Sequence, residues 1–318
     1  MSARLQYSEL PMAVSELETA VLEGLGRSPK AIPPKFFYDR RGSELFDAIC
    51  AQPEYYLPAA EREILQTRAA RIAARTGSGC VLIEPGAGNG AKVRLLLEHI
   101  RPSVFVPLDI SGSYLQASAE RLSRDFPWLR VHAARADFSH GLELPAGLPE
   151  GRRVAFYPGS SLGNFEPEAA VAFLATVREA VGDAGGLLIG IDTKKDTGLL
   201  NAAYNDAAGV TAAFNLNLLH RIRRELETDL DPDNFHHHAF YNPEPGRIEM
   251  HLVSRVAQEV RVNDSLFPFR AGETIHTESS YKYHPEEFRM LARRAGFQPL
   301  DLWLDSRGLF SFHYLEAS

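Results

Sequence analysis

The stretch from Val81 to Lys92, VLIEPGAGNGAK, constrains the fold more than any other part of the chain. Four residues ending at Glu84 predict a short buried strand. Three glycines follow at alternate positions, Gly86, Gly88 and Gly90, and a helix is predicted from Lys92. A strand that passes through a glycine turn into a helix is the first unit of a nucleotide-binding α/β sheet. Because glycines let the backbone approach a ligand closely, we expect a ligand at the carboxyl end of this strand.

Two ligands fit this turn. A dinucleotide site needs G-x-G-x-x-G, or alanine in the last place, and Gly86, Gly88 and Ala91 satisfy it. A site for S-adenosylmethionine needs an acidic residue before G-x-G-x-G, and Glu84 takes that place. A carboxylate would repel a pyrophosphate but not a cationic methionine end. The position of Glu84 therefore favours S-adenosylmethionine and leaves the dinucleotide as the alternative.

The remainder of the chain predicts two domains. Predicted strands alternate with helices from Val81 to Asp192, which indicates a parallel sheet with right-handed crossovers. The alternation stops there, and a long helix over 202–226 and antiparallel strands follow before a C-terminal helix and hairpin. We predict an α/β fold, a Rossmann-like class I methyltransferase sheet with an inserted α+β substrate-binding domain. The predicted parts are 1–60 (N-terminal helical part of the substrate-binding domain), 61–196 (methyltransferase domain), 197–286 (inserted substrate-binding domain) and 287–318 (completion of the methyltransferase domain).

Composition narrows the class of protein. A net charge of −7 argues against a general binder of nucleic acid or anionic membranes. No apolar run has the length of a membrane span, and the first residues lack the apolar core of a signal peptide. Two cysteines, Cys50 and Cys80, fit a reducing compartment. We expect a monomeric cytoplasmic enzyme with a small-molecule substrate.

Polar residues follow three of the predicted strands. Asp109 ends the second strand, where a carboxylate can accept both ribose hydroxyls, although a helix-capping role is the alternative. Asp137 ends the third and could accept from an adenine amino group with Phe138 against the base, or be an ordinary loop residue. Asn164 lies beyond the fourth, where its amide could orient an amine or carboxylate, or belong to a glycine-rich turn.

The run His236-His-His238 does not predict a metal site. Successive strand residues point to opposite faces, so three in a row cannot all reach one ion. No helical metal-binding spacing accompanies it. We therefore expect no metal.

Several motifs together resemble one family. They are FFYDRRGSELFDAI, PEYY, EPGAGNGAK, PLDIS, GSSLGNF, AYNDAAGVTAAFN, RIEMHL and TESSYKY. From about Lys35 to the C-terminus the chain resembles the histidine Nα-methyltransferase of ergothioneine biosynthesis. The resemblance implies methylation of the α-amino group of L-histidine by S-adenosylmethionine, up to the trimethylated betaine hercynine. Pro85 departs from the family pattern in the glycine turn.

The resemblance also implies the residues of the site. Those expected to contact S-adenosylmethionine are Gly86, Gly88, Lys92, Asp109, Asp137 and Phe138. The substrate's α-amino and α-carboxylate end would be held by Tyr55, Asn164 and Tyr204, in a pocket that Tyr38 and Phe46 line. Catalytic roles fall to Tyr38, Asn164 and Tyr204. Glu278 and Ser280 would bind the imidazole beside Met250. The match leaves Tyr55 against Tyr56, and Ser279 against Ser280, open by one position.

Three other functions remain as alternatives at this point. One is Nα-methylation of a different free amino acid. Another is a NAD-dependent dehydrogenase, because the glycine pattern alone allows it. The third is an amino-acid sensor without catalytic activity, against which the intact Gly86, Lys92, Asp109 and Asn164 argue.

Overall fold

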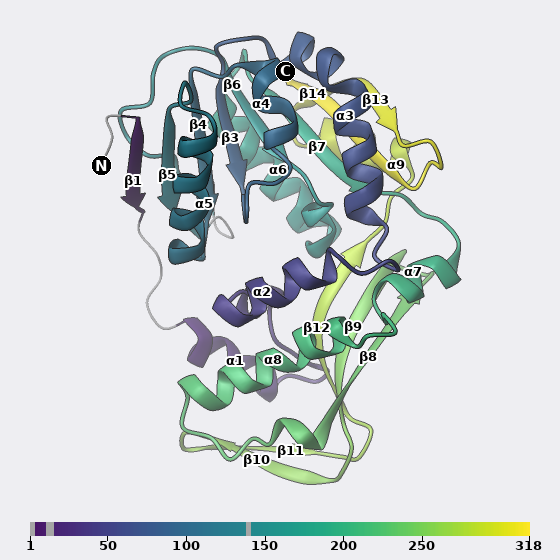
Figure 1. The fold of residues 1–318 in the computed structure, drawn as a ribbon. Coiled ribbons are helices and arrows are strands. Elements are labelled where there is room, and N and C mark those ends of the chain that lie inside the picture. The colour runs from purple at the N-terminus through teal and green to yellow at the C-terminus, as the bar shows by residue number, and fades with distance from the viewer. Residues whose placement is uncertain (1–3, 11–15, 138–140) are drawn as a thin grey trace. The chain divides into compact units, whose positions relative to one another are not determined.

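A computed structural model describes residues 4–10, 16–137 and 141–318, and the chain divides into two compact units (Figure 1). The first unit contains the N-terminal strand together with Leu57–Lys194 and Lys282–Ser318. The second contains residues 16–56 and Lys195–Tyr281. Each unit is therefore built from segments that are far apart in the sequence.

The first unit is organised by an eight-stranded sheet in the order β1-β5-β4-β3-β6-β7-β14-β13. The strands are β1 (Leu5–Glu9), β3 (Val81–Pro85), β4 (Val104–Asp109), β5 (Val131–Arg135), β6 (Arg153–Tyr157), β7 (Gly186–Asp192), β13 (Phe297–Leu304) and β14 (Phe310–Ala317). Neighbours from β1 to β7 are parallel, whereas β14 is antiparallel to both β7 and β13. The predicted parallel sheet closed by a C-terminal hairpin is confirmed.

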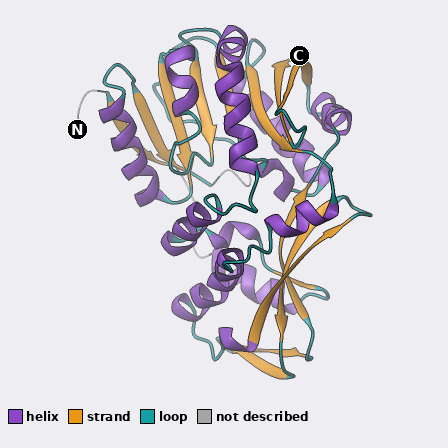
Figure 2. Cartoon of the chain, turned by 45° about the vertical axis from the view of Figure 1, so that its right-hand side comes forward, coloured by secondary structure: helices purple, strands orange, loops and turns teal. Residues whose placement is uncertain are grey.

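Helices cover both faces of this sheet. They are α3 (Leu57–Thr76), α4 (Arg94–Ile100), α5 (Gly112–Asp125), α6 (Pro167–Val181) and α9 (Pro285–Arg294), with the short 3-10 helix η2 (Ser161–Asn164) after β6. The strand order moves one way from β3 through β4 to β5 and the other way from β3 through β6 to β7. Right-handed crossovers then place α4 and α5 on one face and α6 on the other. Figure 2 shows these helices in purple around the orange strands.

The second unit contains a four-stranded sheet in the order β2-β12-β9-β8 and a separate hairpin of β10 and β11. Its strands are β2 (Lys30–Ala31), β8 (Phe235–Asn242), β9 (Arg247–Ser254), β10 (Gln258–Val262), β11 (Ser265–Phe269) and β12 (Thr274–Tyr281). Its helices are α1 (Glu16–Gly26), η1 (Pro34–Phe37), α2 (Arg40–Ile49), α7 (Thr197–Ala203), α8 (Val210–Glu225) and η3 (Pro232–Asn234). Helix α8 packs on α2 and on η1, and the ring centroids of Phe37 in η1 and Phe214 in α8 lie 4.6 Å apart.

Two local features differ from the sequence expectation. Residues 5–9, assigned to an N-terminal helical part, form β1 and pair with β5. The long helix expected over 202–226 is two helices, α7 and α8. The break is stabilised by Asp206, whose carboxylate accepts from the backbone nitrogens of Val210 and Thr211, and by Gly209 with a φ of 71°. Both carboxylate bonds satisfy amides at the start of α8, so a new helix begins there.

A buried ion pair marks the place where the chain leaves and re-enters the first unit. The Nζ of Lys282 lies 2.9 Å from Oδ2 of Asp192, and both side chains are fully buried. The backbone nitrogen of Tyr283 also donates to the carbonyl oxygen of Asp192, at 3.1 Å. These contacts fasten the ends of the 195–281 segment to the end of β7.

In the part of the chain that the structure describes, no helix combines the length and the apolar character that crossing a membrane requires.

The imidazole of His313 on β14 predicts a measurable pH dependence of stability. Burial lowers its pKa from 6.5 to about 3, with the positive charge of Arg289 acting in the same direction. Below pH 6.5 the unfolded chain binds a proton that the native state excludes. His313 therefore stabilises the fold fully above pH 6.5, and this contribution declines as the pH falls toward 3, by up to about 1.4 kcal/mol per pH unit.

The measurement is the free energy of unfolding in urea between pH 7 and pH 4, for the wild type and His313→Gln. Glutamine can keep a polar atom near Ser311 Oγ, which lies 3.1 Å from His313 Nε2. We expect the variant to lose the part of the acid slope that the histidine contributes. Equal slopes in the two proteins would contradict the assignment.

Candidate active site

The glycine turn lies at the carboxyl edge of the parallel strands. Gly86, Gly88 and Gly90 have φ values of 69°, 53° and 69°, in the left-handed region that favours glycine. The backbone nitrogen of Gly86 donates to the carbonyl oxygen of Leu108 at 2.8 Å, which holds the turn against the end of β4. Ligands of open α/β sheets bind at this edge.

Asp109 connects the glycine turn to the following helix. Its Oδ2 accepts from the backbone nitrogen of Gly88 at 3.0 Å, and its Oδ1 accepts from that of Ser111 at 2.9 Å. Burial raises the pKa of Asp109, and the backbone hydrogen bonds oppose this shift. The sequence left ribose binding and helix capping as alternatives. In the structure no side chain caps α5: the bond to Ser111 closes a local turn before the helix, and the bond to Gly88 fixes the glycine turn.

Glu84 is a buried carboxyl group at the end of β3. Burial raises its pKa well above the usual value, while Lys92 acts in the opposite direction. Its Oε2 is buried and has no hydrogen-bond partner among the described residues. An orphaned carboxylate oxygen beside a glycine turn fits a ligand that carries an ammonium group. This observation therefore agrees with the methionine end of S-adenosylmethionine.

Lys92 forms an ion pair that the sequence did not predict. Its Nζ lies 2.7 Å from Oε2 of Glu61, a buried residue of α3. The other oxygen of Glu61 accepts from the backbone nitrogen of Gly159, in the loop after β6, at 2.7 Å. Glu61 thus joins the loops that follow β3 and β6. A glutamate within the apolar stripe of a helix was the available signal, because such a position is rarely charged without a partner.

The remaining first-unit residues lie beyond the neighbouring strands. Asp137 follows β5 and is half-buried, and Asn164 ends η2 after β6 and is also half-buried. Both strands are parallel to β3, so both residues lie at the edge where the glycine turn lies. Phe138, which was expected to lie against the base, is outside the described residues.

In the second unit a hydroxyl pair joins α7 to β12. The hydroxyl of Tyr204 donates to Oγ of Ser280 at 2.9 Å, and the ring of Tyr55 meets that of Tyr204 edge-on, with centroids 6.1 Å apart. Glu278, two residues before Ser280, is buried and pairs across the strands with the buried Met250. Tyr55, Tyr204 and Ser280 therefore form one contact group, and Glu278 and Met250 lie on the same face of the sheet as Ser280.

The contacts of the neighbouring residues separate the two ambiguous pairs. The hydroxyl of Tyr56 accepts from Nζ of Lys195 at 2.6 Å, whereas Tyr55 contacts Tyr204. Ser279 Oγ lies 3.3 Å from His276 Nε2, on the face opposite to Ser280. The geometry thus groups Tyr55 and Ser280, rather than Tyr56 and Ser279, with Tyr204.

A second group of aromatic side chains lies in the same unit. Tyr38 lies edge-on to both Phe46 and Phe214, with ring centroids 5.8 Å apart in each case. Burial raises the pKa of Tyr55 well above its usual value, and the phenol of Tyr204 and the carboxylate of Glu278 act in the same direction. Tyr55 therefore remains a protonated hydroxyl at neutral pH.

A buried polar network that the sequence did not predict supports β12. The strand has a bulge between His276 and Glu278. Within it, the Thr277 hydroxyl lies 2.8 Å from Asn215 Oδ1 and 3.0 Å from the Met250 carbonyl oxygen.

The network continues from Asn215 to the backbone of Tyr204. Asn215 Nδ2 lies 2.9 Å from His237 Nδ1, and His237 Nε2 lies 3.0 Å from the Tyr204 carbonyl oxygen. Burial lowers the pKa of His237, so its imidazole is neutral and can accept at one nitrogen and donate at the other. The chain of bonds connects the bulge before Glu278 with the residue that contacts Ser280.

Comparison with known proteins identifies the family. A family model described as histidine-specific, SAM-dependent methyltransferase matches residues 17–317. The chain belongs to this family. It is 40% identical over 311 residues to histidine N-alpha-methyltransferase of Mycolicibacterium smegmatis, covering 96% of both chains. The Mycobacterium tuberculosis protein of the same name is 40% identical, with 92% of each chain covered.

More distant relatives include Ergothioneine biosynthesis protein 1 of Neurospora crassa, 28% identical over 86% of this chain and 32% of that protein. Among solved structures, magnesium protoporphyrin IX methyltransferase from Synechocystis PCC 6803 with bound SAH aligns over 89% of this chain and 97% of that one. Its TM-score is 0.49 and its identity 10%. The family model confirms the predicted family, and the parallel sheet with its antiparallel C-terminal hairpin agrees with the predicted α/β fold.

Two glycines of the turn should respond differently to alanine. A Cβ on Gly88 would meet nothing within 4 Å, whereas a Cβ on Gly90 would lie 2.9 Å from Leu122 Cδ1. Both substitutions strain the backbone by about 1–2 kcal/mol. We expect Gly90→Ala to give the larger loss of thermal stability, because it adds a steric overlap.

For Gly88→Ala the expected result is a loss of affinity for S-adenosylhomocysteine of at least about tenfold, since about 1.4 kcal/mol of lost contact suffices. Calorimetric titration measures the affinity and differential scanning calorimetry the stability. Unchanged affinity in Gly88→Ala would contradict a ligand at this turn.

The network around Asn215 should matter for stability. Thr277→Val keeps the shape of the side chain but leaves Asn215 Oδ1 without its hydroxyl partner, and both residues are almost fully buried. We expect a loss of about 1–3 kcal/mol in the free energy of unfolding. Thr274→Val, at the more exposed start of the same strand, serves as the control and should change stability by less than about 0.5 kcal/mol. Equal effects in urea denaturation would contradict this role.

Proposed function

We propose that the protein transfers methyl groups from S-adenosylmethionine to the α-amino nitrogen of L-histidine, in ergothioneine biosynthesis. Family membership supports the reaction class, and the names of the mycobacterial relatives support the substrate. The observation in this structure that carries the proposal is the pairing of buried Glu278 with Met250, beside the hydroxyl pair of Tyr204 and Ser280.

The first unit acts as the methyltransferase domain. S-adenosylmethionine, when bound there, supplies an electrophilic methyl group on a sulfonium. The residues assigned to hold it are Glu84, Gly86, Gly88, Lys92, Asp109 and Asp137, with Phe138 as a further contact. Glu84 suits the ammonium group because its Oε2 is buried and unpartnered in the described structure. Asp109 suits the ribose because each carboxylate oxygen accepts one backbone hydrogen bond and keeps a second lone pair for a hydroxyl.

The second unit acts as the substrate-binding domain. A carboxylate and a hydroxyl, Glu278 and Ser280, can recognise the two imidazole nitrogens, one as donor and one as acceptor. Met250 supplies an apolar contact beside the ring. A substrate with a purely apolar side chain would offer no hydrogen-bond donor to the buried Glu278 carboxylate, which is unfavourable. These residue types therefore favour histidine over other free amino acids.

The α-amino end is assigned to hydroxyl and amide groups. Tyr55 and Tyr204 of the second unit are assigned to the amine and the carboxylate, in the pocket that Tyr38 and Phe46 line. Asn164, in the first unit, is assigned to the amine. None of these side chains is a strong base at neutral pH, and Tyr55 in particular keeps its proton because its pKa is raised. The rate enhancement then comes from aligning a neutral amine and excluding water.

Aromatic faces explain how methylation can continue to hercynine. Each added methyl group removes one N–H donor, and the trimethylated nitrogen is a permanent cation that donates no hydrogen bond. Tyr38, Tyr55 and Tyr204 can stabilise such a cation through their ring faces, by about 0.5–2 kcal/mol each. These rings support the proposal that methylation proceeds to the trimethylated betaine.

We further propose that the protein acts in the cytoplasm as a monomer and that methyl transfer uses no metal ion. Two cysteines that form no disulfide bond fit a reducing compartment. The proposed chemistry needs an aligned amine and a sulfonium, and neither requires a Lewis acid. Light scattering of the purified protein and activity after chelation test the last two statements.

The decisive experiment is mass spectrometry of each common amino acid after incubation with the protein and S-adenosylmethionine. We expect histidine to gain up to three methyl groups and other amino acids to gain none. Preferential methylation of another amino acid would replace histidine as the substrate. Calorimetric binding of NAD without binding of S-adenosylhomocysteine would exclude methyl transfer altogether.

Glu278→Gln tests the residue that recognises the imidazole. Glutamine keeps the size but loses the charge, so we expect histidine affinity to fall by about 10-fold to 100-fold, equivalent to the about 1.5–3 kcal/mol of a charged hydrogen bond. Binding of S-adenosylhomocysteine should be unchanged. Glu244→Gln, in the exposed turn before β9, is the matched control. Histidine affinity that is the same in both variants would argue against this role for Glu278.

A further inference from the structure

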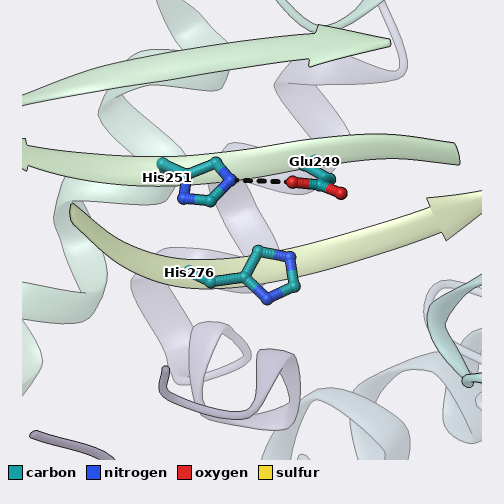
Figure 3. A group of neighbouring side chains, drawn as sticks. All are labelled: Glu249, His251 and His276. Atoms are coloured by element: carbon teal, nitrogen blue, oxygen red, sulfur yellow. Dashed lines mark hydrogen bonds and ion pairs between the residues drawn. The ribbon is translucent and has the colours of Figure 1, made fainter. Parts of the chain in front are cut away.

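Three metal-ligating side chains meet on adjacent strands of the second unit. His251 on β9 lies directly opposite His276 on β12, and Glu249 is two residues before His251 on the same strand (Figure 3). One possible ligand atom from each residue lies within 4.8 Å of the others. The rings of His251 and His276 have centroids 5.0 Å apart. Among the described residues, this is the one group of three or more histidine, cysteine, aspartate or glutamate side chains whose ligand atoms lie this close together.

The cluster is separate from the proposed histidine pocket. Side chains of one strand alternate between the two faces of a sheet, so Glu249 and His251 lie on the face opposite to Met250. The bulge after His276 allows this residue to pair with His251 while Glu278 pairs with Met250. The cluster therefore lies on the face that Met250 and Glu278 do not occupy.

Glu249 is held in a fixed orientation as a carboxylate. Its Oε1 accepts from Arg247 Nε at 2.9 Å and from Asn242 Nδ2 at 3.1 Å. Its Oε2 lies 3.2 Å from His251 Nε2. The two hydrogen bonds to Oε1 orient Oε2 toward a ligand, as outer partners do around metal sites.

His251 and His276 would each bind an ion through Nε2. In His251 this nitrogen lies 3.2 Å from Glu249 Oε2. His276 Nε2 lies 3.0 Å from the carbonyl oxygen of Glu278, a contact in which the nitrogen donates. Ligation through this nitrogen requires the tautomer with the proton on Nδ1.

We propose that Glu249, His251 and His276 bind a divalent transition-metal ion of the Zn²⁺ type. Two imidazoles and one carboxylate are a donor set that suits this ion, with a water molecule as the fourth ligand. Tetrahedral ligands at about 2.0–2.2 Å from the metal are about 3.3–3.5 Å apart, so small side-chain rotations close the present spacing. The ion would replace the contact between His251 and Glu249. The proposal does not depend on the methyltransferase function.

The neighbouring His238 supplies a matched control. It lies opposite His251 on β8, is exposed and is not part of the three-residue group. Its ring stands beside Phe240, with centroids 5.3 Å apart. Replacing His238 therefore removes an imidazole from the same region of the same sheet without removing a proposed ligand.

The test is a titration of the untagged, chelator-treated full chain with Co²⁺, followed by visible absorption, and with Zn²⁺, followed by calorimetry. We expect one ion to bind per chain. His276→Gln and His251→Gln should each weaken binding more than about 100-fold, because losing a direct ligand exceeds the effect of losing an outer partner. His238→Gln should change affinity by less than about threefold, since less than about 0.7 kcal/mol is at stake.

Circular dichroism of each variant checks that the fold is retained, and either histidine variant alone suffices if the other does not fold. Absence of stoichiometric Co²⁺ and Zn²⁺ binding to the wild type would overturn the proposal. So would a loss of affinity in His238→Gln as large as that in His276→Gln, because the ion would then be bound by surface histidines instead.

Discussion

The buried ion pair between Asp192 and Lys282 is the interaction on which the arrangement of the chain depends. It lies where the polypeptide leaves the large sheet after β7 and where it returns before α9. Two charges without access to water are stable only as a pair, and loss of one partner typically costs about 3–5 kcal/mol. The pair therefore fixes both ends of a long insertion against β7.

Much of the first unit could be predicted because its signals are local. The glycine turn, the strand before it and Asp109 after the next strand follow from spacing alone, and the parallel order follows from the alternation of strands and helices. Strand β1 could not be predicted in this way. Its five residues form a strand through pairing with β5, and nothing within Leu5–Glu9 indicates that partner. The break between α7 and α8 did have a signal in Asp206 and Gly209, but the apolar spacing on either side obscured it.

The site residues were assigned from motifs, which leave a choice open where neighbours are alike. Tyr55 and Tyr56 are chemically identical, and they differ only in three dimensions, where Tyr55 contacts Tyr204 and Tyr56 contacts Lys195. Asn215 and Thr277 looked like ordinary polar residues because hydrogen bonds between distant segments are invisible in a sequence. The same holds for Glu249, His251 and His276, which meet only because the register of two strands places His251 opposite His276.

The second unit is discontinuous, and this has a consequence for biosynthesis. Phe37 is fully buried against Phe214, yet the two residues belong to segments that leave the ribosome far apart in time. Residues 16–56 must wait, with their apolar faces uncovered, until α8 has been synthesised. A nascent chain of this protein thus passes through a long interval in which the early segment is a natural client for chaperones.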